Sequence, residues 1–239
     1  MPHEQLTERQ VAAYLSMHLK DVIKLASRQK IPARKVGDEK FLFRKSQVDH
    51  WVWEQMHNFD RNQLEGIERG VFAHHGLDAK SPIVCPLIPE AGLVVPLASK
   101  TRKAVLRDLV EVANSCDLVY DKALVLEELT GREKLCSTAM LPGVALPHPR
   151  HPLEYDIAES FVIAGVSPAG IPFGSEDGSL TRLFFLICCK EDRTHLHVLA
   201  RLVRMLDDPA VVENLIACES PVDFADALAS REYQVIEKD

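Results

Sequence analysis

The sequence lacks the features that mark several other classes of protein. Its longest apolar stretches, such as "LFFLICC" at 183–189, are far shorter than the roughly 20 residues of a membrane-spanning helix. The N-terminal "MPHEQLTERQ" has no apolar secretion segment, and none of the six cysteines has C-x-x-C spacing. The phosphate-binding motif G-x-x-x-x-G-K-[ST] is also missing, which argues against nucleotide-driven kinase chemistry. We therefore expect a cytoplasmic protein without membrane insertion, whose cysteines are reduced thiols.

Charge is unevenly distributed along the chain. Residues 1–57 contain 10 Lys and Arg against 7 Asp and Glu, a balance of +3, whereas the remaining 18 against 28 give −10. A small basic module is suited to nucleic acid, and an acidic remainder is repelled by it. The two parts of the chain are therefore expected to have different partners.

The N-terminal residues follow a helix, turn, helix, hairpin, helix order. Thr7 and Gln10 form a capping box for a short first helix, and a second helix is expected over 20–28. The stretch 30–48 alternates and turns at Gly37 and Asp38, as a hairpin does, and a last helix is expected over 46–53. On the second helix Lys20, Lys24 and Arg28 are spaced by four and lie opposite its apolar face.

These pieces, "LTERQVAAYL", "KIPARKVG" and "FRKSQVDHWV", resemble the excisionase-like, MerR-type winged helix-turn-helix over about residues 5–56. The resemblance implies that the second helix enters the major groove of double-stranded DNA while the hairpin contacts backbone phosphates. Asp21 and Asp38 depart from a purely basic surface, so a module that docks protein stays open as an alternative. The residues expected to bind DNA are Lys20, Lys24, Arg28, Arg34, Lys35 and Arg44.

Residues 57–80 mix charge with three glycines and few apolar anchors, so we expect a linker with about one helical turn. From about residue 83 helical patterns alternate with apolar strands. "VALP", "SFVIAGV" and "LFFLICC" are predicted strands, the last two buried on both faces. Helices are predicted after Ser99, from Asp121 toward Gly131, and in three segments after residue 190.

The predicted fold is α/β, with a central mixed sheet flanked by helices and a small N-terminal winged helix-turn-helix domain. The predicted boundaries are 1–57 for the N-terminal domain, 58–82 for the linker and 83–239 for the α/β domain.

His148 follows a predicted strand in "GVALPHPRHP" and is stiffened by a proline on each side. A neutral imidazole keeps a lone pair in water and forms a bond to phosphorus that is weak enough to be passed on. A second histidine, His195, falls on the apolar stripe of the helix "THLHVLARL", whereas His197 is predicted to face solvent.

"REKLCSTAMLPGVALPHPR", "IPFGSEDG" and "THLHVLARL" resemble the fructose, mannitol and nitrogen-type IIA domain of the bacterial phosphoenolpyruvate:sugar phosphotransferase system, over about residues 83–230. The resemblance implies that His148 accepts phosphate from a small HPr-like phosphocarrier protein and that His195 is the partner imidazole. It also matches Arg132 to an arginine that stabilises the phosphate. Pro149 departs from the Gly or Ala usual at that position and removes a backbone N–H, for which Arg150 and His151 are candidate substitutes.

The fusion favours a transcriptional, nitrogen or carbon regulator that is switched by phosphorylation of His148. A plain phosphoryl relay whose N-terminal domain binds protein, and a stoichiometric binding protein that shuts off an enzyme, stay open. A metal site of His148, His151, His195 and His197 is disfavoured because the two helix histidines are predicted to face apart, so no cofactor or metal is expected. A homodimer is the usual state of a regulator that reads two half-sites.

Overall fold

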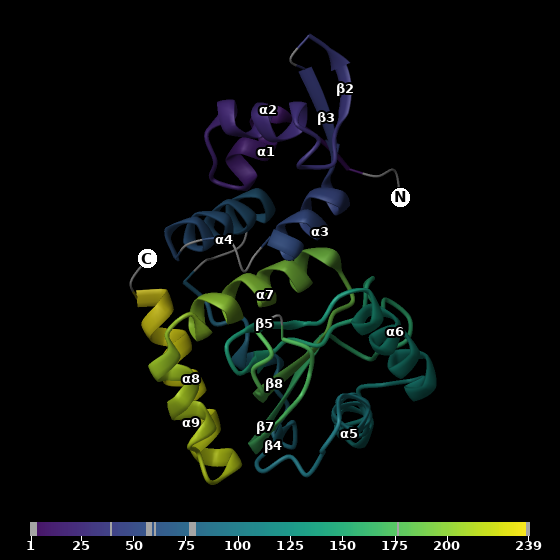
Figure 1. The fold of residues 1–239 in the computed structure, drawn as a ribbon, viewed down its shortest axis with the longest axis vertical. Helices are drawn as coiled ribbons and strands as arrows, with labels where there is room; N and C mark the ends of the chain where they lie inside the picture. Colours follow the sequence, from purple (N-terminus) through teal and green to yellow (C-terminus); the bar gives the residue numbers. More distant parts are fainter. Residues whose placement is uncertain are drawn as a thin grey trace. The chain divides into compact units, whose positions relative to one another are not determined.

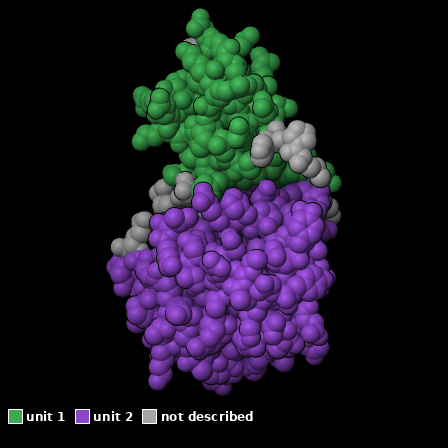
Figure 2. Space-filling model, turned by 90° about the vertical axis from the view of Figure 1, so that its right-hand side faces the viewer, with its two compact units in different colours: residues 1–79 green, residues 80–239 purple. Residues whose placement is uncertain are grey.

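The structure is a computed structural model that describes residues 4–38, 40–55, 59, 61–76, 80–175 and 177–237. The chain forms two compact units, residues 1–79 and residues 80–239 (Figure 2). The predicted boundaries of the N-terminal domain, linker and α/β domain remain a prediction.

Unit 1 is a small sheet with helices packed on it, and it contains the predicted helix, turn, helix, hairpin, helix order with one further strand before it and one further helix after it (Figure 1). The three strands lie in the order β1-β3-β2, and both pairs are antiparallel. Apolar side chains of α1, α2, β3 and α3 fill the core. The elements are β1 (Gln5–Thr7), α1 (Glu8–Tyr14), α2 (Leu19–Ser27), β2 (Arg34–Gly37), β3 (Lys40–Arg44), α3 (Lys45–Gln55) and α4 (Arg61–His75).

The predicted capping box is confirmed at the start of α1. The Thr7 side chain accepts a hydrogen bond from the backbone of Gln10, and the Gln10 side chain accepts one from the Thr7 backbone. The second helix begins after His18, whose side chain makes no capping hydrogen bond. The first helix starts where the capping box predicts, whereas the second starts one residue before the predicted range 20–28 and has no side-chain cap.

Helix α4 is longer than the sequence suggests, and the prediction of about one helical turn is wrong. Gly66 and Gly70 lie where α4 packs on the end of α1. A Cβ at Gly70 would lie 2.3 Å from the backbone oxygen of Tyr14, so the backbones approach more closely than a side chain allows. Two of the three glycines that indicate a linker in the sequence, Gly66 and Gly70, are therefore packing positions in a helix.

Unit 2 has a five-stranded mixed sheet in the order β4-β7-β8-β6-β5. The central pair β7 and β8 is antiparallel, whereas β4 pairs parallel with β7 and β6 parallel with β8. The elements are the short helix η2 (Cys85–Leu87), β4 (Leu93–Val94), α5 (Arg102–Ser115), α6 (Lys122–Leu135), β5 (Ala139–Leu141), β6 (Val144–Ala145), β7 (Phe161–Ile171), β8 (Thr181–Cys188), α7 (Asp192–Leu206), α8 (Pro209–Ile216) and α9 (Pro221–Glu237).

Helices cover both faces of this sheet (Figure 1). Phe184 of β8 belongs to the core cluster that includes α5 and α6, whereas the neighbouring Phe185 lies 6.3 Å from the ring of Phe224 on α9. Successive strand residues point to opposite faces, so both sets are buried. The prediction that "LFFLICC" is buried on both faces is confirmed.

Two predicted helix limits in unit 2 differ from the structure. Helix α5 is capped by Thr101 and not by Ser99, whose hydroxyl donates to the Asp108 carboxylate at 2.6 Å instead. Helix α6 begins after Asp121 as predicted, but it continues through Gly131 to Leu135. Helix α8 begins at Pro209 after its Asp208 cap, as the sequence predicts.

All six cysteines are free, in agreement with the expected thiols, and of these Cys188 and Cys189 are buried. Within the described part of the chain, no helix combines the length and the apolar character needed to cross a membrane.

Candidate functional site

The sheet topology brings His148 and His195 together. His148 follows β6, and α7, which carries His195 in its first turn, follows β8. Because β6 and β8 are parallel neighbours, their carboxyl ends lie at the same edge of the sheet, where α/β folds commonly bind ligands. The two imidazole centroids are 5.0 Å apart with ring planes inclined by 48°. The predicted convergence is therefore present.

The backbone beyond β6 holds His148 in a fixed position. Thr138 accepts a hydrogen bond from Leu146 N at 3.0 Å, and Pro147 accepts one from Ile187 N at 2.8 Å. The side chain of His148 is only 3% exposed. The segment that carries His148 is thus tied to a strand or loop on each side, as the proline-flanked sequence suggests.

One hydrogen bond determines which nitrogen of His148 carries the proton. Nδ1 lies 2.7 Å from the carbonyl oxygen of Leu146. A carbonyl oxygen can only accept, so Nδ1 carries the hydrogen and donates it. In the neutral ring Nε2 then holds the lone pair, which makes Nε2 the nucleophilic atom.

His195 is half-buried, and its surroundings keep it neutral. Burial, together with the nearby positive charge of Arg132, lowers the pKa of His195 from 6.5 to about 4. A neutral imidazole can accept a hydrogen bond at one nitrogen and donate one at the other. Beside His148, such a ring is suited to donate a hydrogen bond to a phosphoryl oxygen without transferring a proton to it.

Arg132 lies in the last turn of α6 and is 6% exposed. Its guanidinium donates to the carbonyl of Cys136 at 2.8 Å, which fixes the side chain toward the loop after the helix. The positive charge of Arg132 contributes to the lowered pKa of His195, so Arg132 lies near the two imidazoles. The structure therefore brings all three predicted site residues together.

The prediction that His197 faces solvent is wrong, because its side chain is fully buried. Helix α7 packs against α8 and α9 as well as against β8, so its polar stripe also lies inside the unit. Arg201 on that stripe is within 3.6 Å of Glu232 on α9, and both residues are buried. In the sequence, the regular spacing of polar residues on this helix predicts a face that is exposed to solvent. In the structure, that face packs against a neighbouring helix.

The loop after His148 begins with a buried proline and then turns outward. Pro149 is buried, whereas Arg150 and His151 are exposed. No group of three or more His, Cys, Asp or Glu among the described residues could hold a metal ion.

The six basic residues predicted to bind DNA are all exposed in unit 1. On α2, Val22 and Ala26 point into the core, which leaves the basic face outward. Arg28 directly follows α2, and the hairpin of β2 and β3 contributes the other three. The exposed set is Lys20, Lys24, Arg28, Arg34, Lys35 and Arg44, and its role in binding stays a prediction.

Comparison with known proteins agrees with this arrangement. The family model described as "Phosphoenolpyruvate-dependent sugar phosphotransferase system, EIIA 2" matches residues 88–231, which is more than half of the chain. The chain belongs to this family. A second model, described as a helix-turn-helix domain, matches residues 6–56.

Relatives of the EIIA 2 part include both regulatory and sugar-specific proteins. A nitrogen regulatory protein of Bradyrhizobium diazoefficiens is 33% identical over 138 residues, which cover 57% of this chain and 87% of that protein. The fructose-specific EIIABC component of Bacillus subtilis is 27% identical over 139 residues, covering 57% of this chain and 21% of that protein. The chain thus spans about a fifth of that protein's length.

The crystal structure of the nitrogen regulatory protein IIA-Ntr from Neisseria meningitidis is similar to the EIIA 2 part, with a TM-score of 0.54 and 25% identity. The match covers 60% of this chain and 97% of that structure. Both the sequence and the fold therefore place the EIIA 2 domain in unit 2.

Sequence analysis of the EIIA 2 domain misses two residues that are linked to His148 through the backbone of Leu146, Glu133 and Thr138. Both are buried, and the Glu133 carboxylate accepts hydrogen bonds from the backbone and the hydroxyl of Thr138. Both lie in the quoted motif "REKLCSTAM", which is the available signal. Their burial cannot be deduced from spacing, because it arises when the loop after α6 folds back on the helix.

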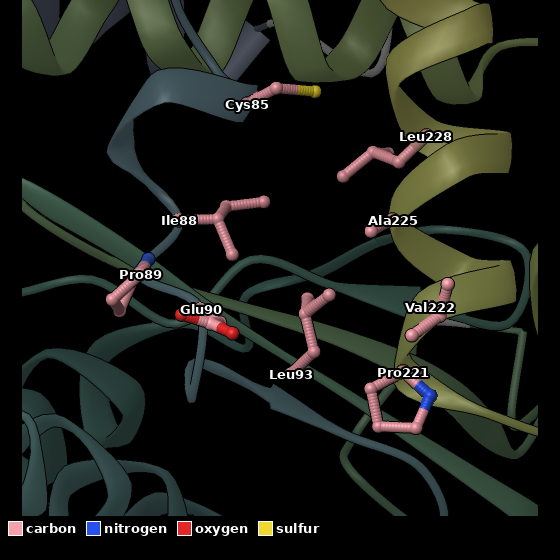
Figure 3. A pocket seen from close by; sticks show the side chains of 9 residues that line it. All are labelled: Cys85, Ile88, Pro89, Glu90, Leu93, Pro221, Val222, Ala225 and Leu228. Atoms are coloured by element: carbon pink, nitrogen blue, oxygen red, sulfur yellow. The ribbon is translucent and has the colours of Figure 1, made fainter.

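A pocket of about 230 Å³ lies between the segment 85–93 and α9 of the EIIA 2 domain (Figure 3). Its walls are mostly apolar, with the Glu90 carboxylate and the Cys85 thiol as the polar groups. Burial is the main cause that raises the pKa of Cys85, so the thiol is neutral. Neither histidine lines the pocket, so it is separate from the candidate site.

Proposed function

We propose that His148 accepts a phosphoryl group from an HPr-like phosphocarrier protein and that this phosphorylation switches the binding of DNA by unit 1. The observation that supports the first part best is the pairing of the imidazoles of His148 and His195 at 5.0 Å. The family membership gives the phosphoryl chemistry, since EIIA 2 belongs to a phosphotransferase system.

In the proposed transfer the Nε2 lone pair of His148 attacks the phosphorus of the donor phosphohistidine. The donor's phosphorus–nitrogen bond breaks, and the donor imidazole recovers its electron pair. The His148 ring becomes positively charged while Nδ1 keeps its hydrogen, and the Leu146 carbonyl at 2.7 Å stabilises that charge. Phosphoryl transfer depends mainly on such positioning and on stabilisation of charge.

The two neighbours of His148 are assigned complementary roles. Neutral His195 donates an N–H to a phosphoryl oxygen, and Arg132 supplies positive charge to the phosphoryl group. Neither role needs a metal ion or a cofactor.

Transfer of label from the phosphorylated carrier tests the first part of the proposal. The full chain is incubated with radiolabelled phosphocarrier, and the labelled residue is mapped. The wild type and His50→Ala, which changes an exposed histidine of unit 1, are expected to take up label, whereas His148→Ala is not. An unlabelled wild type, or label that survives His148→Ala, contradicts the proposal.

The regulatory part rests on the presence of a helix-turn-helix domain in the same chain and on relatives described as nitrogen regulatory proteins. Phosphate adds about 1.5 to 2 negative charges at neutral pH, which is enough to alter an interface. DNA fragments that carry candidate promoters are footprinted with phosphorylated and with unmodified protein. Equal protection by both forms contradicts the switch, and protection by neither form favours a phosphoryl relay whose unit 1 binds protein.

A further inference from the structure

Glu133 forms the first link in a chain of hydrogen bonds that ends at His148. Its carboxylate oxygens lie 3.1 and 3.3 Å from Thr138 N, and Oε2 lies 2.7 Å from Thr138 Oγ1. The carbonyl of Thr138 accepts from Leu146 N at 3.0 Å, and the carbonyl of Leu146 accepts from His148 Nδ1 at 2.7 Å. Three consecutive links thus connect a carboxylate on α6 to the candidate nucleophile.

The Glu133 carboxylate lies in a buried position, which is energetically unfavourable for a charged group. Glu133 is 4% exposed and Thr138 is fully buried. Burial raises the pKa of Glu133, although the hydrogen bonds from Thr138 and the charge of Arg102, 4.0 Å away, oppose that rise. A buried carboxylate is tolerated only where its hydrogen bonds are made, and here Thr138 supplies both a backbone donor and a hydroxyl donor.

The position of Thr138 matters because the strand after it is short. Residues 139–141 and 144–145 form only small strands, β5 and β6, with an irregular register between them. The Thr138 carbonyl extends this pairing by one hydrogen bond to Leu146, the residue whose carbonyl orients the His148 ring. If Thr138 shifts, the carbonyl that selects the tautomer of His148 shifts with it.

We infer that Glu133 is a positioning residue for His148: by holding Thr138, it keeps the Leu146 carbonyl where it fixes hydrogen on Nδ1 and leaves the lone pair on Nε2. The consequence for phosphoryl transfer rests on the proposed function. The tautomer itself is a property of the unphosphorylated protein. An unrestrained neutral imidazole distributes its hydrogen over both nitrogens, so loss of the restraint is measurable.

Three substitutions at Glu133 separate the effects of side-chain length, of charge and of removing the carboxylate altogether. Glu133→Gln keeps the length, and its amide can accept from Thr138 N and donate to Thr138 Oγ1. Glu133→Asp keeps the charge but is one methylene too short, and Glu133→Ala removes the group. Glu127→Gln, an exposed glutamate on the same helix, is the matched control.

The readout is the nitrogen NMR spectrum of the His148 ring in protein labelled at histidine, assigned by its loss in His148→Ala. Wild type, Glu127→Gln and Glu133→Gln are expected to show hydrogen on Nδ1 alone. Glu133→Asp and Glu133→Ala are expected to show a mixture of both tautomers. Their phosphorylation rate falls by up to about a hundredfold, the scale of a displaced reacting group.

Thermal unfolding identifies the variants that remain folded, and if Glu133→Ala does not fold, Glu133→Asp carries the test. Folded Asp and Ala variants with the wild-type tautomer overturn the inference, since Glu133 then only stabilises the domain. If Glu133→Gln and Glu133→Ala lose the Nδ1 tautomer of His148 to the same extent, the inference is also overturned, because the charge of Glu133 and not its position would then matter. If the tautomer responds as expected but the wild type takes up no phosphate, the proposed function fails while the positioning role stands.

Discussion

The imidazole of His195 is neutral at physiological pH because burial and the charge of Arg132 lower its pKa to about 4. The unfolded chain takes up a proton on this residue below its ordinary pKa of 6.5, whereas the folded protein resists protonation until about 4. Between these two values the unfolded state binds more protons. The contribution of His195 to stability is therefore complete above 6.5 and is lost as the pH falls toward 4.

We expect His195→Gln to weaken this pH dependence. Urea unfolding of wild type and variant, measured between pH 7 and pH 5, gives the change in the free energy of unfolding. Extended to pH 4, the full difference is on the order of 1 to 3 kcal/mol. Identical pH dependence in the two proteins contradicts the assignment of a lowered pKa to His195.

The chemistry of the candidate site is predictable from the sequence, but the residues that position its two histidines are not. His148 and His195 stand out because their motifs resemble a family and because strand and helix patterns place each side chain. Glu133 belongs to the same motif, yet its role depends on a loop closing over the end of α6, which no periodicity encodes. The prediction for His197 fails because a polar stripe indicates solvent only when no other helix covers it.

At the scale of elements, the packing of α4 on α1 depends on the absence of a side chain at Gly70. A Cβ there would lie 2.3 Å from a backbone oxygen, whereas a Cβ at Gly131 in α6 meets nothing within 4 Å. Gly70→Ala is expected to destabilise unit 1 by about 1–3 kcal/mol, the usual cost of overpacking. Gly131→Ala is expected to stabilise α6 by about 0.5–1 kcal/mol.

Both tryptophans, at positions 51 and 53, lie in unit 1, so their fluorescence follows the unfolding of that unit during chemical denaturation. Circular dichroism follows the unfolding of the whole chain and measures the change in stability caused by Gly131→Ala. A Gly70→Ala protein as stable as the wild type would show that α4 does not pack on α1 as described.

A second element-level feature is the buried carboxylate of Glu232 on α9. It accepts hydrogen bonds from the backbone of Ile83, Val84 and Cys85 at 2.7–2.9 Å, and it lies 3.6 Å from Arg201 on α7. One side chain thus joins two helices to the first residues of unit 2.

Removing this carboxylate takes the nearby negative charge away from a buried guanidinium and leaves three backbone donors without their acceptor. Glu232→Ala is therefore expected to lower the free energy of unfolding by about 3–5 kcal/mol. Glu237→Ala, at an exposed position on the same helix, is expected to change it by less than about 0.5 kcal/mol. Urea unfolding followed by circular dichroism compares the two variants, and similar values for both would contradict the role of Glu232.

The element order of both units is largely predictable, since capping residues and apolar periodicity are local signals. Helix α4 is not, because Gly66 and Gly70 resemble linker glycines until the surface that they pack against is known. Ser99 illustrates the same limit at a helix start, because its hydroxyl binds the carboxylate of Asp108, which comes near only in the folded chain.

At the scale of the whole molecule, positive charge gathers in residues 1–57 while the rest of the chain is acidic. If α2 contacts DNA phosphates, replacing Lys20, Lys24 and Arg28 by Gln weakens binding to a random-sequence duplex. The dependence of affinity on salt also falls by about one unit of slope for each phosphate that the variant no longer neutralises. Fluorescence anisotropy at several salt concentrations measures both.

The matched control for this variant replaces three exposed lysines of unit 2, Lys100, Lys103 and Lys134, by Gln, which makes the same change in net charge. It is expected to keep the wild-type salt dependence. A control whose affinity falls as much as that of the α2 variant would show that net charge, and not α2, governs binding.

The most direct test of the central claim is the phosphorus NMR spectrum of the full chain after phosphorylation by the carrier, because the two phosphohistidine isomers give distinct signals. The arrangement of His148, with hydrogen on Nδ1 directed at Leu146, predicts a single phosphoryl group on Nε2 that is absent from His148→Ala. Phosphate on Nδ1 of His148, or on any other residue, would contradict it.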